Sequence, residues 1–135
     1  MARQTVEKTH NVAVVEKFLE AFQKWCSPDC AFTLVHMEPY LATHFHLKNN
    51  GVTYAKSAAD YATACVEKYR SNYTHCKISI KHDSILTFEN KVVLQFEAIF
   101  TGSQGKKRAT YKMAVATLEN DKIVDWQEVT SGAAS

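Results

Sequence analysis

Apolar and polar residues alternate along the second half of the chain, and this alternation predicts β-strands. Apolar residues occupy every second position from Val92 to Phe100 and again from Ala109 to Val115. A period of two is typical of strands with one buried face. Turn-forming residues separate these runs at Glu89-Asn90, at Gly102 to Lys107 and at Asn120-Asp121. Residues 77–130 are therefore expected to form an antiparallel meander of four strands.

The turns also predict which residues face one another. A two-residue turn at 120–121 places Met113 opposite Glu128. The preceding glycine loop is expected to bring Thr101 opposite Arg108. Both registers then put the same apolar rows on one face, as a sheet with one buried side requires. The predicted inner face comprises Val92, Leu94, Phe96, Ala98, Phe100, Ala109, Tyr111, Met113, Val115, Trp126 and Glu128.

One segment breaks this pattern. Ile85 belongs on the inner face, yet Ile78 and Ile80 have the opposite parity. One extra residue near His82–Ser84 would restore the alternation. We therefore predict a β-bulge there, which would also curve the sheet.

The first part of the chain has helical periodicity. Thr5 to Trp25 is predicted to be a helix, ended by Ser27-Pro28-Asp29 because proline cannot continue it. Its apolar stripe comprises Val12, Val15, Phe18, Leu19, Phe22 and Trp25. Cys30 to Met37 is rich in β-forming residues and is expected to be a strand, which Pro39 ends.

The middle of the chain adds a short strand, a turn and a second helix. Tyr40 to Leu47 is expected to be a short strand, and Asn49-Asn50-Gly51 a turn. Ser57 to Tyr69 is predicted to be a helix with Ser57 as its N-cap. The order of elements predicts an α+β domain, with helices covering one face of a curved antiparallel sheet.

Composition narrows the class of protein. The 135 residues are expected to form a single domain, ordered from about residue 5 to 130. A net charge of +2, with no basic run longer than Lys106 to Arg108, argues against nucleic acid as a partner. Met1 to His10 lacks the apolar core of a signal peptide, and no apolar stretch is long enough for a membrane span. The small residues 131–135 are expected to be loose.

The cysteines indicate the compartment. Cys26, Cys30, Cys65 and Cys76 form no CxxC pair, which argues against both a zinc site and a disulfide framework. Reduced thiols with a structural role, in a cytoplasmic protein, are the expectation.

Four segments resemble the nuclear transport factor 2-like superfamily, in particular its SnoaL-like branch. They are the opening helix Val12–Trp25, the step at Ser27–Asp29, the helix entry Ala55–Ala59 and the closing turn and strand Asn120–Trp126. The resemblance implies a cone-shaped fold, in which a curved sheet wraps a long N-terminal helix and leaves a pocket at its wide end. Members include isomerases, dehydratases, cyclases and epoxide hydrolases, and also non-catalytic scaffolds, so fold does not decide function.

Glu128 is the principal candidate for chemistry. The two registers place it on the inner face beside Met113 and Tyr111. A carboxyl group in an apolar pocket can serve as a general acid or base. The alternative is a strand-end residue that reaches solvent or pairs with a lysine.

Further candidates surround this position. His36, near the end of the first predicted strand, could move a proton, as the base at this place does in the isomerases that the chain resembles; Glu38 is a weaker candidate. Tyr54 and Tyr111 could donate hydrogen bonds to an oxyanion. The expected ligand-binding residues are Phe18, Phe22, Tyr54, Phe96, Tyr111, Met113 and Trp126.

A metal site is not expected. His44 and His46 share one side of their strand, and His36 or His75 could be a third ligand, but no acidic or cysteine spacing supports such a site.

Two functions remain open. One is a pocket for a small hydrophobic molecule, with a lyase, isomerase or cyclase reaction that needs no cofactor. The other is a non-catalytic homodimeric interaction or scaffold module whose own side chains fill the cone. In either case, a homodimer is expected to form through the outer sheet face. That face is predicted to carry Val93, Gln95, Ile99, Ala114, Ala116, Leu118, Ile123 and Gln127.

Overall fold

The protein is described by a computed structural model that covers residues 2–131, with side chains from residue 9 onward. The first helix, α1 (Ala2–Trp25), is long and unbroken, as the apolar stripe predicts. Phe18 lies in its C-terminal half, with ring contacts to Trp25 at 6.1 Å and to Trp126 at 5.3 Å. Residues 132–135 of the expected loose tail lie outside the described residues, whereas Ser131 ends the last strand.

The C-terminal end of α1 is capped by a residue far away in the sequence. The last carbonyl groups of a helix have no partner within it. Arg70 Nη1 donates hydrogen bonds to the carbonyl oxygens of Trp25, Ser27 and Cys30 at 2.8, 3.0 and 2.8 Å. This contact fastens the second helical segment to the end of the first.

The segment after α1 is not the strand that its β-forming residues predict. Residues 31–33 are irregular, and Leu34–Met37 is a 3-10 helix. The backbone N–H of Thr33 donates to Nδ1 of His36 at 2.9 Å, which stabilises the turn locally. Met37 is the buried residue of this helix, so the segment does not bury alternate side chains as a strand with one buried face would.

Within the described residues, seven strands form one sheet in the order β2-β1-β7-β6-β5-β3, and β4 also pairs with β5. The strands are β1 (Leu41–Asn49), β2 (Val52–Ala55), β3 (His75–Ile80), β4 (Leu86–Phe88), β5 (Lys91–Thr101), β6 (Lys107–Glu119) and β7 (Lys122–Ser131). The pairing of β1 with β7 is parallel, so the sheet is mixed rather than purely antiparallel as expected.

The register between β5 and β6 differs from the expected one by a single residue. Thr101 pairs with Lys107, not with Arg108. Because side chains alternate between faces, this slip inverts β6. Tyr111 and Met113 therefore lie on the outer face. The residues of β6 that are buried on the inner face are Thr110, Ala114, Ala116 and Leu118.

A second slip follows between β6 and β7. The turn at Asn120-Asp121 forms as predicted, with both residues at positive φ. Thr117 then pairs with Asp125, because the register shifts by one residue beyond the pair Leu118 and Ile123. This bulge allows Ile123 and Trp126 both to be buried.

The irregularity expected near His82 is larger than a one-residue bulge. His82–Ser84 is a short 3-10 helix between β3 and β4. Ile80 pairs with Phe96, whereas Leu86 pairs with Val93, so three additional residues separate the two registers. Because three is an odd number, the side chains of Ile80 and Ile85 can face the same side of the sheet, which the predicted bulge was meant to achieve.

The second helical segment begins as expected but has an unexpected wide turn. Ser57 Oγ accepts a hydrogen bond from the N–H of Asp60 at 3.0 Å, which confirms the N-cap. The segment comprises α2 (Ala58–Tyr61), a π-helical turn (Ala62–Val66) and α3 (Glu67–Asn72). Glu67 N–H donates to the carbonyl oxygen of Ala62, the hydrogen bond of a π turn.

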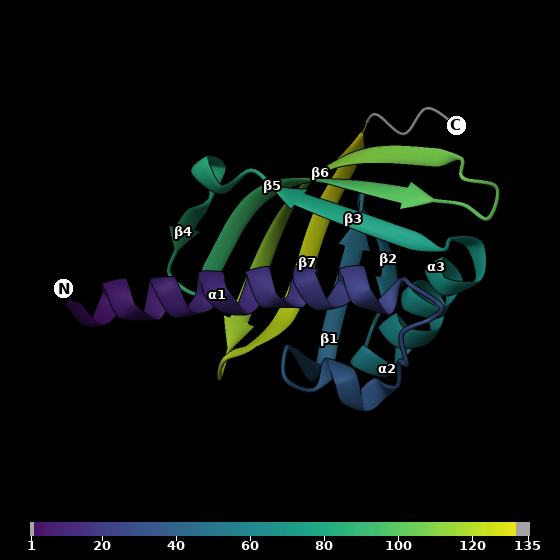
Figure 1. The fold of residues 1–135 in the computed structure, drawn as a ribbon. Coiled ribbons are helices and arrows are strands. Elements are labelled where there is room, and N and C mark those ends of the chain that lie inside the picture. The colour runs from purple at the N-terminus through teal and green to yellow at the C-terminus, as the bar shows by residue number, and fades with distance from the viewer. Residues whose placement is uncertain (1, 132–135) are drawn as a thin grey trace.

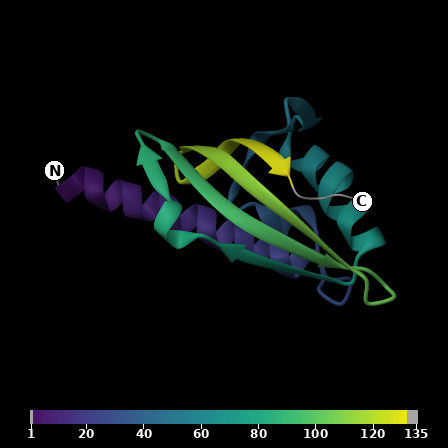
Figure 2. The same cartoon turned by 90° about the horizontal axis from the view of Figure 1, so that it is seen from above.

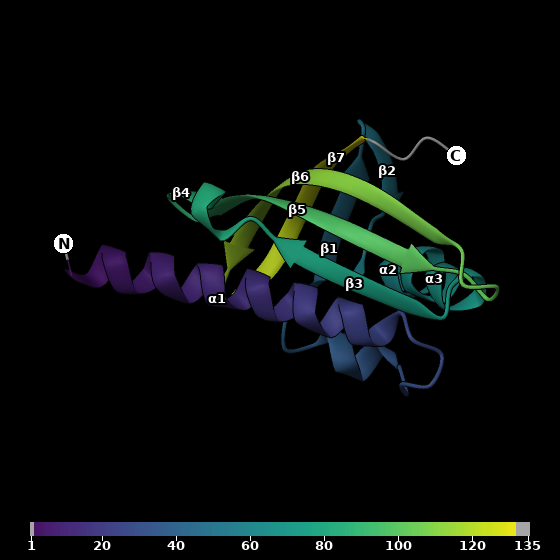
Figure 3. The same ribbon diagram turned by 45° about the horizontal axis from the view of Figure 1, so that its top comes forward.

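These elements form the predicted α+β cone. Helix α1 crosses the concave face of the sheet, and the α2–α3 segment covers one end (Figure 1). Seen from above, the long strands β5 and β6 run obliquely over α1 (Figure 2), and the intermediate view shows β3 at the edge beside that helix (Figure 3). Within the described residues, no helix has the length and apolar character needed to cross a bilayer.

Candidate functional site

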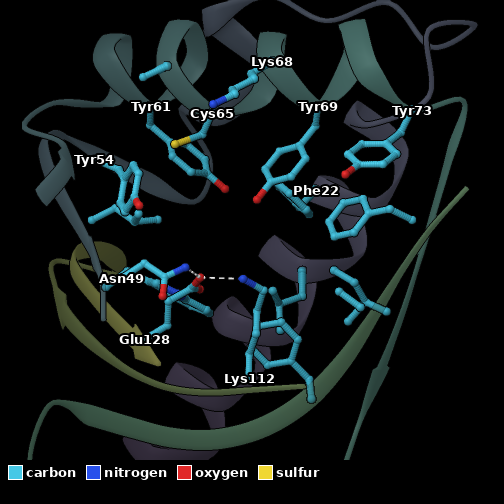
Figure 4. Close-up of a pocket in the computed structure, with 18 of the residues that line it drawn as sticks. Phe22, Asn49, Tyr54, Tyr61, Cys65, Lys68, Tyr69, Tyr73, Lys112 and Glu128 are labelled. Atoms are coloured by element: carbon cyan, nitrogen blue, oxygen red, sulfur yellow. Dashed lines mark hydrogen bonds and ion pairs between the residues drawn. The ribbon is translucent and has the colours of Figure 1, made fainter. Parts of the chain in front are cut away.

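A cavity of about 370 Å³ lies between α1, the α2–α3 segment and the inner face of the sheet. Figure 4 shows this space, with helix side chains on one side and the sheet on the other. Nine of the 21 residues that line it are aromatic. The aromatic lining residues are Phe18, Phe22, Tyr54, Tyr61, Tyr69, Tyr73, Phe96, Phe100 and Trp126.

Glu128 faces this cavity, as the alternation predicts, but its neighbours are not the predicted ones. Its Oε2 accepts hydrogen bonds from Lys112 Nζ at 2.7 Å and from Asn49 Nδ2 at 3.0 Å. Its Oε1 accepts one from Trp126 Nε1 at 2.7 Å. An ionised carboxylate is acceptor-only and satisfies all three donors. The Lys112 and Glu128 side chains are only 9% and 10% exposed, so this ion pair is largely shielded from water.

A second set of contacts holds the donors in place. Lys112 Nζ also donates to Thr130 Oγ1 at 3.1 Å, and that hydroxyl donates to Asn49 Oδ1 at 3.2 Å. The Asn49–Gly51 turn docks on β7, because Asn50 N–H donates to the carbonyl oxygen of Glu128 at 2.9 Å. The arrangement therefore draws on β1, β6 and β7, which are remote in the sequence.

Tyr61 and Tyr69 face the ion pair from the opposite wall. Figure 4 shows both hydroxyl groups pointing into the cavity. The Tyr61 ring is 4% exposed and lies against Phe45 at 5.2 Å, and the Tyr69 ring stacks on Phe100 at 4.8 Å. Neither hydroxyl forms a hydrogen bond with the part of the chain that the structure describes. Burial raises the pKa of both Tyr61 and Tyr69, so each is a protonated hydrogen-bond donor at neutral pH.

The π turn explains why these tyrosines share one wall. Tyr69 follows Tyr61 by eight positions, and in an ideal α-helix that spacing would rotate one from the other by about 80°. A π turn takes up one additional residue and removes most of this rotation. Cys65, within the π turn, also lines the cavity. Burial, and secondarily the charge of Glu128, raises the pKa of the Cys65 thiol to about 11.

Five of the expected ligand-binding residues line the cavity, and two do not. Phe18, Phe22, Tyr54, Phe96 and Trp126 are in its wall.

Tyr111 and Met113 were expected there but lie on the outer face, 53% and 46% exposed, because of the slip between β5 and β6. The same slip places Lys112 inside. Lys112 was not predicted to line the cavity, because the inner face was assigned by its large apolar residues. The signal that could have indicated it is a lysine in the middle of an alternating strand.

His36 is not brought together with Glu128. It lies exposed on the 3-10 helix Leu34–Met37, where its ring stacks on Phe32 at 6.3 Å, and it does not line the cavity. Glu38 is exposed as well. Both were placed near the cavity only by the strand that this segment does not form.

The remaining histidines stay apart from the cavity. His44 and His46 are exposed on β1, as the strand alternation predicts. No group of three or more His, Cys, Asp or Glu side chains suited to a metal ion occurs among the described residues. All four cysteines are free thiols.

Solved structures show which known fold this arrangement matches. An epoxide hydrolase of M. tuberculosis described as LEH-like superposes with a TM-score of 0.74 over 93% of this chain and 85% of its own, at 16% identity. AclR from Streptomyces galilaeus, a candidate hydroxylase, gives a TM-score of 0.72 over 92% of this chain and 80% of its own, at 14% identity.

IdmH from Streptomyces antibioticus, a candidate polyketide cyclase, gives a TM-score of 0.71 over 90% of this chain and 91% of its own, at 9% identity. The chain has the nuclear transport factor 2-like fold. A candidate SnoaL-like polyketide cyclase from Jannaschia shares this fold, with a TM-score of 0.67 over 92% of this chain and 87% of its own, at 9% identity. No protein-family model and no curated protein matches the sequence. At these identities, what the NTF2-like neighbours share with this chain is the fold.

Proposed function

We propose that this chain binds a small, largely apolar molecule in the cavity and moves a proton on it without a cofactor, with Glu128 as the base. One observation carries this proposal: two tyrosine hydroxyls, which form no hydrogen bond with the described residues, face a buried, oriented carboxylate across the cavity. An apolar wall with a few convergent polar groups is typical of small-molecule sites. The reactions of this class are isomerisation, elimination and ring closure.

The proton transfer can be written on a ketone. The Glu128 carboxylate takes a proton from the carbon next to the carbonyl group, and the electrons of that C–H bond form the C=C bond of an enolate. The negative charge moves to oxygen, where Tyr61 and Tyr69 donate hydrogen bonds. In a β,γ-unsaturated ketone, return of the proton from Glu128 to the γ-carbon of the dienolate isomerises the C=C bond. In a ketone with a second carbonyl group, attack of the enolate carbon on that carbonyl closes a ring, and the alkoxide that forms takes the proton back from Glu128. Lys112 and Asn49 act as positioning residues that orient the Glu128 carboxylate.

The alternative is a scaffold whose own side chains fill the cone. A cavity of about 370 Å³ favours binding over this alternative, because it falls within the size range of ligand pockets. The neighbours of the same fold that are named as a hydrolase or as candidate cyclases agree with a pocket of this kind.

Deuterium exchange tests the proposal directly. Bicyclic ketones such as acetylnaphthalene and tetralone are incubated with the protein in D2O, and incorporation next to the carbonyl is measured by mass spectrometry. Glu128→Gln should abolish the protein-dependent exchange. Glu119→Gln, at an exposed turn-end position, is the matched control and should exchange as the wild type does. Exchange that persists in Glu128→Gln would exclude Glu128 as the base, and a failure of all ketones to bind would exclude the pocket function.

We also propose a homodimer that forms through the outer sheet face, although the residues on that face differ from the expected ones. Ala114, Ala116, Leu118 and Ile123 were expected on that face but are buried inside. The face instead exposes Tyr111, Met113 and Val129, of which Met113 and Val129 are cross-strand partners.

Light scattering at micromolar concentration should give twice the chain mass for the wild type. Met113→Glu should give the mass of one chain, because the charge would have to be buried in the interface. A wild-type monomer would exclude the dimer.

Four free thiols support a reducing compartment, and we propose the cytoplasm.

A further inference from the structure

The cavity is lined by two exposed cations, Lys68 and Arg108, that have no counterion among the described residues. Lys68 on α3 and Arg108 on β6 both line the cavity and are both exposed. Neither side chain forms an ion pair with the residues that the structure describes. The cavity wall holds one carboxylate, Glu128, and Lys112 already pairs with it. The positive charge of Lys68 and Arg108 is therefore left for something that enters from solvent.

The two cations belong to the two walls of the cavity, Lys68 to the helical wall and Arg108 to the sheet. Lys68 precedes Tyr69, whose ring stacks on Phe100 at 4.8 Å with the ring planes 5° apart. Arg108 is the cross-strand partner of Phe100. The stacked Tyr69 and Phe100 rings thus connect the helix that carries one cation to the strand that carries the other.

The distance from mouth to ion pair can be read along β6. Arg108 and Lys112 are four residues apart on one face of the strand, which corresponds to about 13 Å. The wall between them is apolar and aromatic, with Phe96, Ala98 and Phe100 on the neighbouring strand. A ligand that reaches the Glu128 carboxylate and fills this length would place its outer end at Arg108, on the wall that faces the helix carrying Lys68.

We propose that the ligand is a flat apolar molecule with an acidic group at one end, and that this group binds between Lys68 and Arg108. This inference rests on the proposed function, since it assigns the ligand class of the same cavity. Arg108 can hold a carboxylate through two parallel N–H donors, and Lys68 adds a point charge. The acidic end sets the orientation, so that the opposite end of the molecule meets Glu128 and the tyrosines.

A matched pair of probes tests the inference. Acetylnaphthoic acid and its methyl ester share the rings and the ketone and differ in charge, and their dissociation constants are measured by calorimetry at low salt. The acid should bind more tightly than the ester by roughly threefold for each cation, as expected for exposed ion pairs. Lys68→Gln and Arg108→Gln should each reduce this preference, and added salt should weaken it.

Two controls separate the possible causes. Lys107→Gln removes a cation next to Arg108 that points to the other face of β6 and does not line the cavity, so the preference should stay at the wild-type value. Ala64→Trp, at an exposed position of the cavity rim, should block both probes if they bind in the cavity.

Equal affinity for acid and ester, or an equal loss of preference in Lys107→Gln, would overturn the anionic ligand while leaving the pocket function intact. Binding of neither probe would count against both proposals.

Discussion

Lys112 and Glu128 are diagonal neighbours on the inner face of the sheet, and their charged groups meet at 2.7 Å. Lys112 pairs with Thr130 across the β6–β7 ladder, and Glu128 pairs with Ala114, so the two charged residues stand two positions apart along the ladder. Side chains on such a diagonal are within reach of each other when one of them is long. The pair is a buried polar centre in a cavity with many aromatic lining residues, and the first prediction follows from it.

The first prediction concerns the stability that depends on this pair. Lys112→Met leaves a buried carboxylate without its cation, and the free energy of unfolding should fall by about 3 kcal/mol. Adding Glu128→Met should restore part of this loss, because no unpaired charge remains. Urea unfolding measures both. Asp121→Asn, which removes an exposed contact with His10, is the control and should change stability by less than about 1 kcal/mol. Additive losses in the double variant would contradict the coupling.

The second prediction concerns the Tyr61 hydroxyl. Because this hydroxyl has no hydrogen-bond partner among the described residues, Tyr61→Phe should leave the thermal midpoint unchanged or raise it slightly. The same substitution should weaken the binding of acetylnaphthalene, whose carbonyl group would lose a donor. Tyr111→Phe on the outer face should not affect that binding. A clear loss of stability in Tyr61→Phe would show that the hydroxyl has a structural partner.

The third prediction concerns alkaline pH. Burial raises the pKa of Cys65 from 9.0 to about 11, and it raises the pKa of Tyr61 above its ordinary value of 10.0. Between the ordinary pKa of Cys65 and its raised value, the unfolded chain releases a proton that the folded chain retains. The stability from these groups is therefore complete below pH 9 and is lost as the pH rises toward 11. The midpoint of thermal unfolding, measured across this interval, should fall less steeply in Cys65→Ala. An unchanged slope would contradict the assignment.

The fourth prediction concerns the π turn. Deleting Thr63, an exposed residue of this turn, should convert it into an ordinary α-helical turn. Tyr69 would then follow Tyr61 by seven positions, which in an α-helix is about 20° short of two full turns, so both tyrosines should still face the cavity. Helix content by circular dichroism and the affinity for acetylnaphthalene should therefore both be retained. A clear fall in affinity would show that the cavity needs the wide turn itself and not only the alignment of the two tyrosines.

Local chemistry was sufficient to predict much of this fold. The apolar stripe of α1, the Ser57 cap and the turn at Asn120-Asp121 depend on residues close together in the sequence, and each was predicted correctly. The β-forming composition of residues 30–37 was misleading, because a strand also needs a neighbour with free hydrogen-bonding groups. In the folded protein, β1 takes the place beside β7, and that choice is not encoded within residues 30–37 themselves.

The orientation of Glu128 was predicted correctly through two errors that cancel. One slip between β5 and β6 inverts β6, and the opposite slip between β6 and β7 restores the parity of β7. A single slip would have turned Glu128 outward, since side chains alternate with every residue. The predicted neighbours, Tyr111 and Met113, were wrong for the same reason.

The sequence by itself determined the class of the fold and the two helical segments, because periodicity and turn chemistry act over a few residues. Tertiary structure decided the site. Asn49, Lys112 and Glu128 lie on three different strands, and their meeting depends on register and on the parallel pairing of β1 with β7. The facing tyrosines depend on a π turn that helical periodicity does not reveal. Non-local pairing is chosen by the packing of the whole core, so no short stretch of this chain specifies the cavity.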